Sequence, residues 1–215
     1  MTPDLSLYLI ADVPTCVAAG RTVAETVAAA VAGGVTAVQL RDKNARGGEL
    51  LDTVRAVAAV LPADVPLIVN DRVDVYLAAR RTGVPVAGVH VGQADLPAAV
   101  TRALIGSDAL LGLSAGTPDA LDAANSAPVD YLGIGAVRAT RTKLDAPPPL
   151  GVPAFGRLVR SSVHPAVAIG GVRVDDLPGL RAAGAAGAAV ASAVCTADDP
   201  ERAARRLASA WREAA

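Results

Sequence analysis

A short strand-like run followed by a helix-like stretch recurs eight times along the chain. Each unit passes from a β-branched or leucine-rich run through a small polar or glycine-rich break into an alanine-rich stretch with helical spacing. Strands that alternate with helices at this interval form parallel pairs connected by helical crossovers. The expected strands cover residues 5–12, 35–42, 66–71, 86–92, 110–115, 129–137, 165–171 and 186–194.

The stretches between these strands carry helix start and stop signals. The expected helices include residues 22–32, 49–61, 96–105, 175–183 and 200–213. Thr22 and Glu25 have the spacing of a capping box, and Asp199 before Pro200 is typical of a helix N-terminus. Eight such units in 215 residues favour one α/β domain over residues 1–215, a closed (β/α)8 TIM barrel. An open doubly wound sheet is the alternative, although no dinucleotide-type glycine fingerprint follows the first strand.

The composition argues against several classes of partner. The 20 Lys and Arg against 21 Asp and Glu leave a net charge of −1, and one Trp, three Tyr and one Phe offer few rings for base stacking. We therefore expect no nucleic-acid partner. Without a secretory signal or an apolar run of about 20 residues, we also expect no membrane partner and a cytoplasmic location. Cys16 and Cys195 are too few for a disulfide framework or a four-ligand zinc site.

The second expected strand carries polar side chains on one face. Gln39, Arg41 and Lys43 alternate with Val38 and Leu40, which would face the helices. Two cations that point inward near the mouth of a barrel require an anion, because an unpaired inward charge is costly. An anionic substrate satisfies this requirement, and so does a structural ion pair with a neighbouring strand.

Acidic residues follow the next two strands. Asn70-Asp71 ends the third expected strand, and Asp95 follows the fourth. Carboxylate and amide oxygens are hard ligands of the kind that Mg²⁺ accepts together with substrate phosphate. The competing interpretation is that both aspartates cap the helices that follow them. Together with the cations of the second strand, they suggest a magnesium-bridged diphosphate.

A second phosphate site is expected after the last two strands, where barrels often bind phosphate. Gly170 and Gly171 end the seventh strand, and Ala191-Ser192 lies near the end of the eighth. Glycines there allow backbone N–H groups to approach an anion, although an ordinary tight turn has the same sequence. The polar run 140–143, in the loop between the two sites, could close over phosphates or stay solvated. His90 is expected to point inward, either as a satisfied interior side chain or as a substrate contact.

Taken together, these segments resemble the thiamine-phosphate synthase family in order and spacing over nearly the whole chain. The segments that carry the resemblance are Gln39-Leu40-Arg41-Asp42-Lys43, Asn70-Asp71-Arg72-Val73-Asp74, Gly88-Val89-His90-Val91-Gly92-Gln93 with Asp95, Thr140-Arg141-Thr142-Lys143 with Asp145-Ala146-Pro147, and Ala168-Ile169-Gly170-Gly171. The resemblance implies a transferase that joins hydroxymethylpyrimidine diphosphate to a thiazole phosphate, giving thiamine phosphate and diphosphate by Mg²⁺-assisted dissociative displacement.

The resemblance also implies roles for individual residues. Arg41, Lys43 and Lys143 would act in catalysis, and Asp71 and Asp95 would ligate Mg²⁺. The residues implied for the pyrimidine diphosphate are Gln39, Leu40, Arg41, Asp42, Lys43, Asn70, Ser114 and Lys143. The residues implied for the thiazole phosphate are Thr140, Arg141, Thr142, Gly171, Ala191 and Ser192. Whether the chain forms a homo-oligomer is left open by the sequence.

One segment departs from the family pattern. Relatives commonly have Gly-Pro, an apolar residue, an aromatic residue and Pro-Thr where this chain has residues 135–140, Gly-Ala-Val-Arg-Ala-Thr. The loss of two prolines and a ring predicts a less restrained loop, and Arg138 is gained. Two other functions stay open: a thiazole tautomerase-like isomerase on the same fold, and a non-catalytic sensor of phosphorylated thiamine precursors. Retention of Thr140, Thr142, Lys143 and both aspartates argues against the isomerase, which has no diphosphate to expel.

Overall fold

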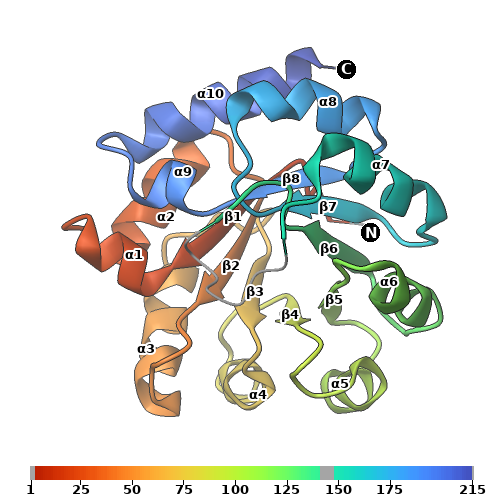
Figure 1. Ribbon diagram of the computed structural model, residues 1–215. Helices are drawn as coiled ribbons and strands as arrows, with labels where there is room; N and C mark the ends of the chain where they lie inside the picture. The colour runs from red at the N-terminus through yellow and green to blue at the C-terminus, as the bar shows by residue number, and fades with distance from the viewer. Residues whose placement is uncertain (1–2, 141–147, 215) are drawn as a thin grey trace.

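The computed structural model describes residues 3–140 and 148–214, and it shows a closed barrel of eight parallel strands. The strands follow one another around the barrel in chain order, and β8 closes it by pairing with β1 (Figure 1). Their bounds are β1 Leu7–Asp12, β2 Ala37–Arg41, β3 Leu67–Asn70, β4 Gly88–Val91, β5 Leu110–Ser114, β6 Tyr131–Gly135, β7 Ala166–Ile169 and β8 Gly187–Val190. The expected (β/α)8 fold is therefore confirmed, and the open sheet is excluded.

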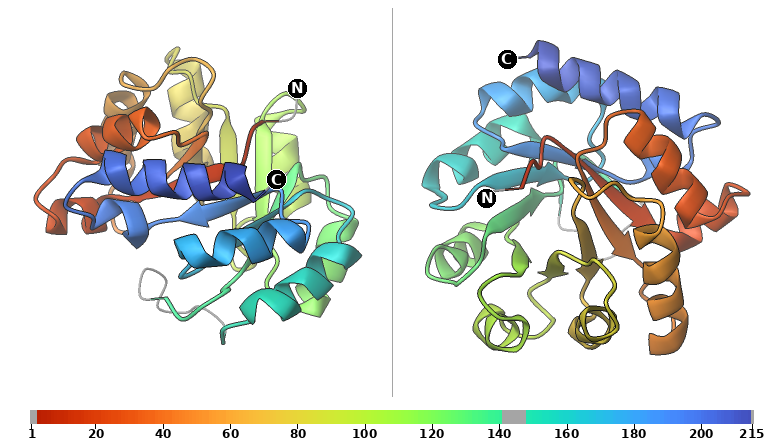
Figure 2. Two further views of the ribbon diagram at one scale, coloured as in Figure 1. Left: turned by 90° about the horizontal axis from the view of Figure 1, so that it is seen from above. Right: turned by 180° about the vertical axis from the view of Figure 1, so that it is seen from behind.

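Helices surround this barrel on the outside, as both views of Figure 2 show. Their bounds are α1 Val13–Ala18, α2 Val23–Ala32, α3 Gly47–Ala58, α4 Val73–Arg81, α5 Ala98–Ile105, α6 Pro118–Asn125, α7 Gly151–Ser161, the 3₁₀ turn η1 Val174–Asp176, α8 Leu177–Ala182, α9 Ser192–Cys195 and α10 Pro200–Glu213. The long C-terminal helix α10 packs against α2 and α8, so the end of the chain covers its beginning. Among the described residues, no helix is long and apolar enough to cross a membrane.

Near the place where β8 pairs with β1, one prediction from the sequence is wrong and one helix was not predicted. The eighth strand was expected over residues 186–194, but β8 ends at Val190 and residues 192–195 form the short helix α9. Small and β-branched residues continue without a break through this segment, so composition alone does not mark the turn. The six-residue helix α1 was also not predicted. It starts directly after β1, where the Asp12 side chain accepts the backbone N–H of Thr15.

The expected helix-start signals are present where they were predicted. The Thr22 side chain accepts the Glu25 N–H, and the Glu25 side chain accepts the Thr22 N–H, so the capping box of α2 is complete. Asp199 accepts the Arg202 N–H at the start of α10. Each such cap contributes about 1 kcal/mol to helix stability.

Successive side chains of each strand point to opposite faces of the barrel wall, which gives two separate hydrophobic cores. Outward-facing side chains such as Leu7 and Leu9 pack in the large core between the barrel and the helices. Inward-facing side chains such as Tyr8, Ile10 and Tyr131 form a smaller core inside the barrel. Full burial of one large apolar side chain contributes about 1.5–3 kcal/mol. Because the interior is filled in this way, the space left for a ligand lies at the carboxyl ends of the strands.

Candidate active site

A cavity of about 360 Å³ lies at the carboxyl ends of the strands. All eight strands or the loops that follow them contribute to its wall. Of the residues named from the sequence, the following line it: Gln39, Arg41, Lys43, Asn70, Asp71, Asp95, Ser114, Thr140, Gly171, Ala191 and Ser192. The topology thus brings together side chains that are up to about 150 positions apart in the sequence, as a barrel mouth does.

Two of the named residues lie elsewhere. The Leu40 side chain is fully buried in the core between barrel and helices, because successive side chains of β2 point to opposite faces. Asp42 does not line the cavity; its carboxylate accepts the backbone N–H groups of Asn44 and Ala45 and thereby shapes the loop after β2. Neither side chain is therefore a wall of the candidate site. Arg141, Thr142 and Lys143 lie outside the described residues.

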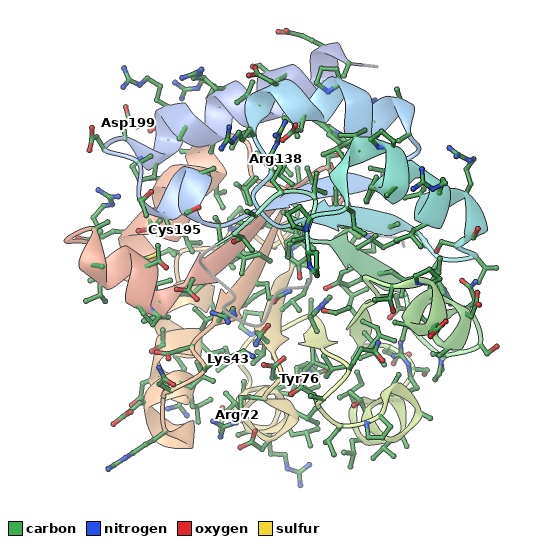
Figure 3. All side chains as sticks on the ribbon, viewed as in Figure 1. Lys43, Arg72, Tyr76, Arg138, Cys195 and Asp199 are labelled. Carbon is green, nitrogen blue, oxygen red and sulfur yellow. The ribbon has the colours of Figure 1, made fainter. Side chains whose placement is uncertain are left out.

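The cations named from β2 have different surroundings. Arg41 lines the cavity and is also paired with Asp12 at the end of β1, so the structural ion pair and the anion-facing position coexist. Both side chains of this pair are mostly buried. Lys43 lies beyond the end of β2, in the loop rather than in the strand, and its Nζ is 3.9 Å from Asp71 Oδ2. Figure 3 shows the labelled Lys43 at the mouth of the barrel.

The two aspartates face each other across the ends of β3 and β4. Burial, followed by the neighbouring Asp95 carboxylate, raises the pKa of Asp71 to about 6. Asp95 also accepts the backbone N–H of Gly92 at 2.7 Å. The helix-cap interpretation is wrong for both, because α4 and α5 have Arg72 and Pro97 as their N-terminal caps. Asp71 has a φ of 59°, a left-handed conformation that it alone adopts among the described non-glycine residues.

This pair of carboxylates fits a divalent cation of the Mg²⁺ type. The Asp95 carboxylate disfavours the charged form of Asp71, a repulsion that a nearby cation would relieve, and the oxygens of both groups are the hard ligands that Mg²⁺ prefers. Among the residues that the structure describes, no three His, Cys, Asp or Glu side chains gather into a complete metal site. Such a cation would therefore take its remaining ligands from water and from substrate phosphate, as Mg²⁺ commonly does.

A chain of hydrogen bonds crosses the floor of the cavity from β2 to β5. Gln39 Nε2 donates to the Tyr8 hydroxyl at 2.9 Å, and Tyr8 and Tyr131 share a hydrogen bond of 2.8 Å. His90 Nδ1 lies 3.1 Å from the Tyr131 hydroxyl, and His90 Nε2 lies 3.0 Å from Ser114 Oγ. The expected inward orientation of His90 is confirmed. The chain links two residues that face the cavity, Gln39 and Ser114, through three buried groups.

A glycine in β5 makes room for this chain. A Cβ atom on Gly112 would lie 2.3 Å from His90 Nδ1 and 2.4 Å from the Tyr131 hydroxyl oxygen. Any larger residue would therefore separate His90 from Tyr131. Burial raises the pKa of both tyrosines above the ordinary value, so both remain neutral at physiological pH.

Two walls of the cavity differ in chemistry. We call Arg41, Lys43, Asp71 and Asp95 the charged side, because ionised side chains from the β2, β3 and β4 ends form it. We call residues 170–171, 191–192 and Thr140 the backbone side, because glycine, alanine and hydroxyl-bearing residues form it. Gly170 and Gly171 have φ values of 92° and 64°, which other residues rarely adopt, and small residues here let a ligand approach main-chain N–H groups.

Some residues at or next to the site have no role assigned from the sequence. Asp12 is one of them: it ends β1 opposite Arg41, a contact that depends on the register of β1 against β2. Tyr8 and Tyr131 could have been found from strand alternation, which sends both into the barrel. Gln93 also lines the cavity, and its side chain donates to the Ser114 carbonyl at 2.6 Å.

A closed (β/α)8 barrel with a cavity at its carboxyl end, lined by cations, paired carboxylates and glycine loops, defines a barrel enzyme that acts on anionic small molecules. A family model described as thiamine monophosphate synthase matches residues 7–194. The chain therefore belongs to the thiamine monophosphate synthase family.

Individual relatives agree with this family. The chain is 48% identical to the thiamine-phosphate synthase of Azorhizobium caulinodans, over 95% of this chain and 93% of the relative. It is 47% identical to that of Xanthobacter autotrophicus, over 96% and 95%. Among solved structures, thiamine phosphate pyrophosphorylase from Pyrococcus furiosus superposes with a TM-score of 0.86 at 32% identity, over 99% of this chain and 98% of that one.

Proposed function

We propose that the chain is a thiamine-phosphate synthase, a transferase that moves the hydroxymethylpyrimidine group from its diphosphate to a thiazole phosphate. The products are thiamine phosphate and diphosphate. The observation that carries this proposal is the single cavity in which a charged side and a backbone side face each other, in a chain of this family. One side suits a diphosphate with a divalent cation, and the other suits a monophosphate.

The charged side would hold the pyrimidine diphosphate. Arg41 and Lys43 offer cationic donors to its phosphate oxygens, and the Asp12 pair holds the Arg41 side chain in place. Gln39 and Ser114, at the two ends of the buried hydrogen-bond chain, would contact the pyrimidine ring through their amide and hydroxyl groups. The family resemblance also assigns Lys143 to the pyrimidine diphosphate. It assigns Arg141 and Thr142 to the thiazole phosphate.

Asp71 and Asp95 would hold Mg²⁺ against the diphosphate. The cation would supply charge neutralisation to the leaving group, the usual contribution of Mg²⁺ in phosphate chemistry. Lys43, 3.9 Å from Asp71 Oδ2, lies where a lysine can contact the same diphosphate. The raised pKa of Asp71 supports this assignment, because burial and the neighbouring Asp95 carboxylate both disfavour its charged form, which a bound cation would stabilise.

The reaction requires the protein to bind both substrates and to stabilise charge, but it requires no nucleophile from the protein. The bond between the pyrimidine methylene carbon and the diphosphate oxygen breaks, and the diphosphate leaves with the electron pair. The thiazole nitrogen then donates its lone pair to the methylene carbon, which forms the new C–N bond. Negative charge grows on the departing diphosphate, so Arg41 and Lys43 would interact more strongly with the transition state than with the bound substrate.

The backbone side would hold the thiazole phosphate. The main-chain N–H groups around Gly171 and Ser192, together with the Ser192 and Thr140 hydroxyls, offer neutral donors to a phosphate dianion. Placing that phosphate opposite the charged side leaves the thiazole ring between the two sides, next to the pyrimidine methylene carbon. Holding both reactants in this way converts a bimolecular step into one within a single complex.

A reconstituted reaction tests the proposal. Purified protein is incubated with hydroxymethylpyrimidine diphosphate, thiazole phosphate and Mg²⁺, and thiamine phosphate is followed by mass spectrometry with and without a chelator. We expect product that disappears on chelation and returns when Mg²⁺ is added in excess. Conversion of a thiazole tautomer without coupling would instead indicate an isomerase. Binding of either phosphate without any turnover would indicate a sensor.

A further inference from the structure

The loop after β6 lies against the loop after β7. The backbone N–H of Val137 donates to the Ile169 carbonyl at 2.9 Å, and that of Arg138 donates to the Gly170 carbonyl at 2.8 Å. These bonds continue the pairing of β6 with β7 beyond the ends of both strands. Thr140 follows two residues later, and it faces the cavity that Gly171 also lines.

The Arg138 side chain turns away from that cavity and binds Asp176. Its Nε lies 2.8 Å from Asp176 Oδ2 and 3.0 Å from Oδ1, and its Nη2 lies 2.6 Å from Oδ1. Arg138 does not line the cavity, and Figure 3 shows it beneath α8, on the far side of the barrel mouth from Lys43. The pair therefore ties the loop after β6 to the start of α8.

The Asp176 side chain is buried and also bonds to the backbone of its own loop. Its side chain is 4% exposed, and its Oδ2 also accepts the Arg173 backbone N–H at 3.0 Å. The Arg138 guanidinium, through its hydrogen bonds, holds the pKa of Asp176 below the usual range. Asp176 is therefore ionised at neutral pH, and a forked charge-assisted contact of this kind fixes direction as well as distance.

The loop after β6 and the loop after β7 pack closely beside the Arg138–Asp176 pair, and we call this contact the seam. A Cβ atom on Gly171 would lie 2.7 Å from the Ala139 carbonyl oxygen and 2.9 Å from Arg138 Cβ. A small shift of residues 138–139 would therefore move the main chain on both sides of the seam. Residues 135–140 contain no proline to restrict their backbone, so a restraint from another part of the fold has a clear physical use here.

We propose that Arg138 is a positioning residue, which pairs with Asp176 to hold the loop after β6 on the loop after β7, so that Thr140 and Gly171 bind the same phosphate. This inference rests on the proposed function, because it assigns that phosphate to the thiazole substrate. Arg138 acts through the loop and does not touch the substrate.

The test compares the KM values of the two substrates in matched variants. Arg138→Met removes the fork and keeps most of the side-chain volume, and Arg157→Met makes the same change at an exposed position of α7. We expect Arg138→Met to raise the KM of thiazole phosphate about tenfold and that of the pyrimidine diphosphate less than about twofold. Arg138→Lys, which keeps the charge but not the fork, should fall between Arg138→Met and the wild type.

Two outcomes would overturn the inference. One is a KM of thiazole phosphate that Arg138→Met leaves unchanged, and the other is an equal rise in both KM values. If Arg138→Met does not fold, Asp176→Asn decides by the same criterion, because the amide keeps an oxygen that accepts the Arg173 N–H. If the wild type forms no thiamine phosphate, the proposed function fails, and calorimetric binding of thiazole phosphate to wild type and Arg138→Met then decides the inference alone.

Discussion

The charged side and the backbone side of the cavity consist of different kinds of residue. The charged side places ionised groups from the ends of β2, β3 and β4 within a short distance of one another, as the Lys43–Asp71 pair shows. The backbone side presents glycine and alanine residues with neighbouring hydroxyls from the ends of β6, β7 and β8. The charged side therefore offers charged side chains to a ligand, and the backbone side offers neutral main-chain N–H groups and hydroxyls.

This difference matches what each side is proposed to do. A leaving diphosphate gains negative charge during the reaction, so cationic side chains and a divalent metal would stabilise its departure. A phosphate that merely anchors the second substrate keeps its charge throughout, so fixed neutral donors suffice. Substitutions on the charged side should therefore lower kcat, whereas substitutions on the backbone side should raise the KM of one substrate.

The largest effect is expected from Asp71→Asn. Asparagine tolerates the left-handed backbone of residue 71, so the change removes one carboxylate and leaves the local fold in place. Turnover should fall by about 10³-fold or more, because a metal ligand is lost on the side where charge develops. Asp74→Asn on α4, outside the cavity, is the matched control. Turnover within about tenfold of wild type at saturating Mg²⁺ would refute the ligand role.

The next largest effect is expected from Lys43→Met. Removal of this cation should lower kcat by about 10²-fold with a smaller change in either KM, because the lysine would act mainly on the departing diphosphate. Arg46→Met, three positions along the same loop, is exposed and does not line the cavity, so it should leave kcat unchanged. Steady-state kinetics with both substrates varied separates the two parameters. A rise in KM alone would place Lys43 in ground-state binding.

A substitution on the backbone side should give the opposite pattern. Gly171→Ala adds a Cβ that meets the Ala139 carbonyl, so the KM of thiazole phosphate should rise between about 10- and 100-fold with kcat less affected. Gly83→Ala is the control, because Gly83 also has a positive φ but nothing lies within 4 Å of its added Cβ. Both variants should lose about 1–2 kcal/mol of stability. Similar KM values in the two would show that backbone strain alone explains the effect.

A smaller effect is expected between the two sides, on the buried hydrogen-bond chain. Tyr131→Phe removes the hydroxyl that joins Tyr8 to His90, which should lower the free energy of unfolding by about 1–3 kcal/mol. Turnover should fall less than about tenfold, because Gln39 keeps its bond to Tyr8. Tyr76→Phe on α4 lies outside the cavity and provides the comparison. A loss of turnover as large as that of Lys43→Met would mean that Tyr131 itself acts on the substrate.

The smallest effect concerns stability in acid. Because the pKa of Asp176 is lowered in the folded chain, its pairing stabilises the fold above the unfolded value of about 3.9, and this contribution is lost as the pH falls through the folded value. Arg138→Met removes the main cause of the shift. The difference in free energy of unfolding between wild type and Arg138→Met should therefore shrink from pH 6 to pH 3, measured by chemical denaturation. A constant difference would indicate lost packing rather than a lost ion pair.

The fold and the charged side could be predicted from the sequence for a common reason. Strand–helix alternation is a local signal, and charged residues at strand ends stand out from a chain that is mostly apolar. Asp71 and Asp95, which follow adjacent strands, could be paired once the barrel was expected. Arg41 could be placed at the mouth, but its partner Asp12 could not, because the register of β1 against β2 decides that contact.

The backbone side was harder to predict because small residues carry little information. Gly170 and Gly171 are compatible with any tight turn, and their steric contacts with residues 136–139 depend on how two loops pack. The missing prolines pointed to a loosely held loop, whereas the structure supplies a restraint through Asp176, 38 positions away. Leu40 was named through the family segment, although alternation already placed it against the helices.

The central claim is that two different phosphate groups bind on opposite sides of one cavity. A crystal structure with thiamine phosphate, diphosphate and Mg²⁺ tests it most directly. The account predicts the cation between Asp71 and Asp95, the diphosphate against Arg41 and Lys43, and the monophosphate beside Gly171 and Ser192. A monophosphate seated on the charged side, or a cation that touches neither aspartate, would contradict it.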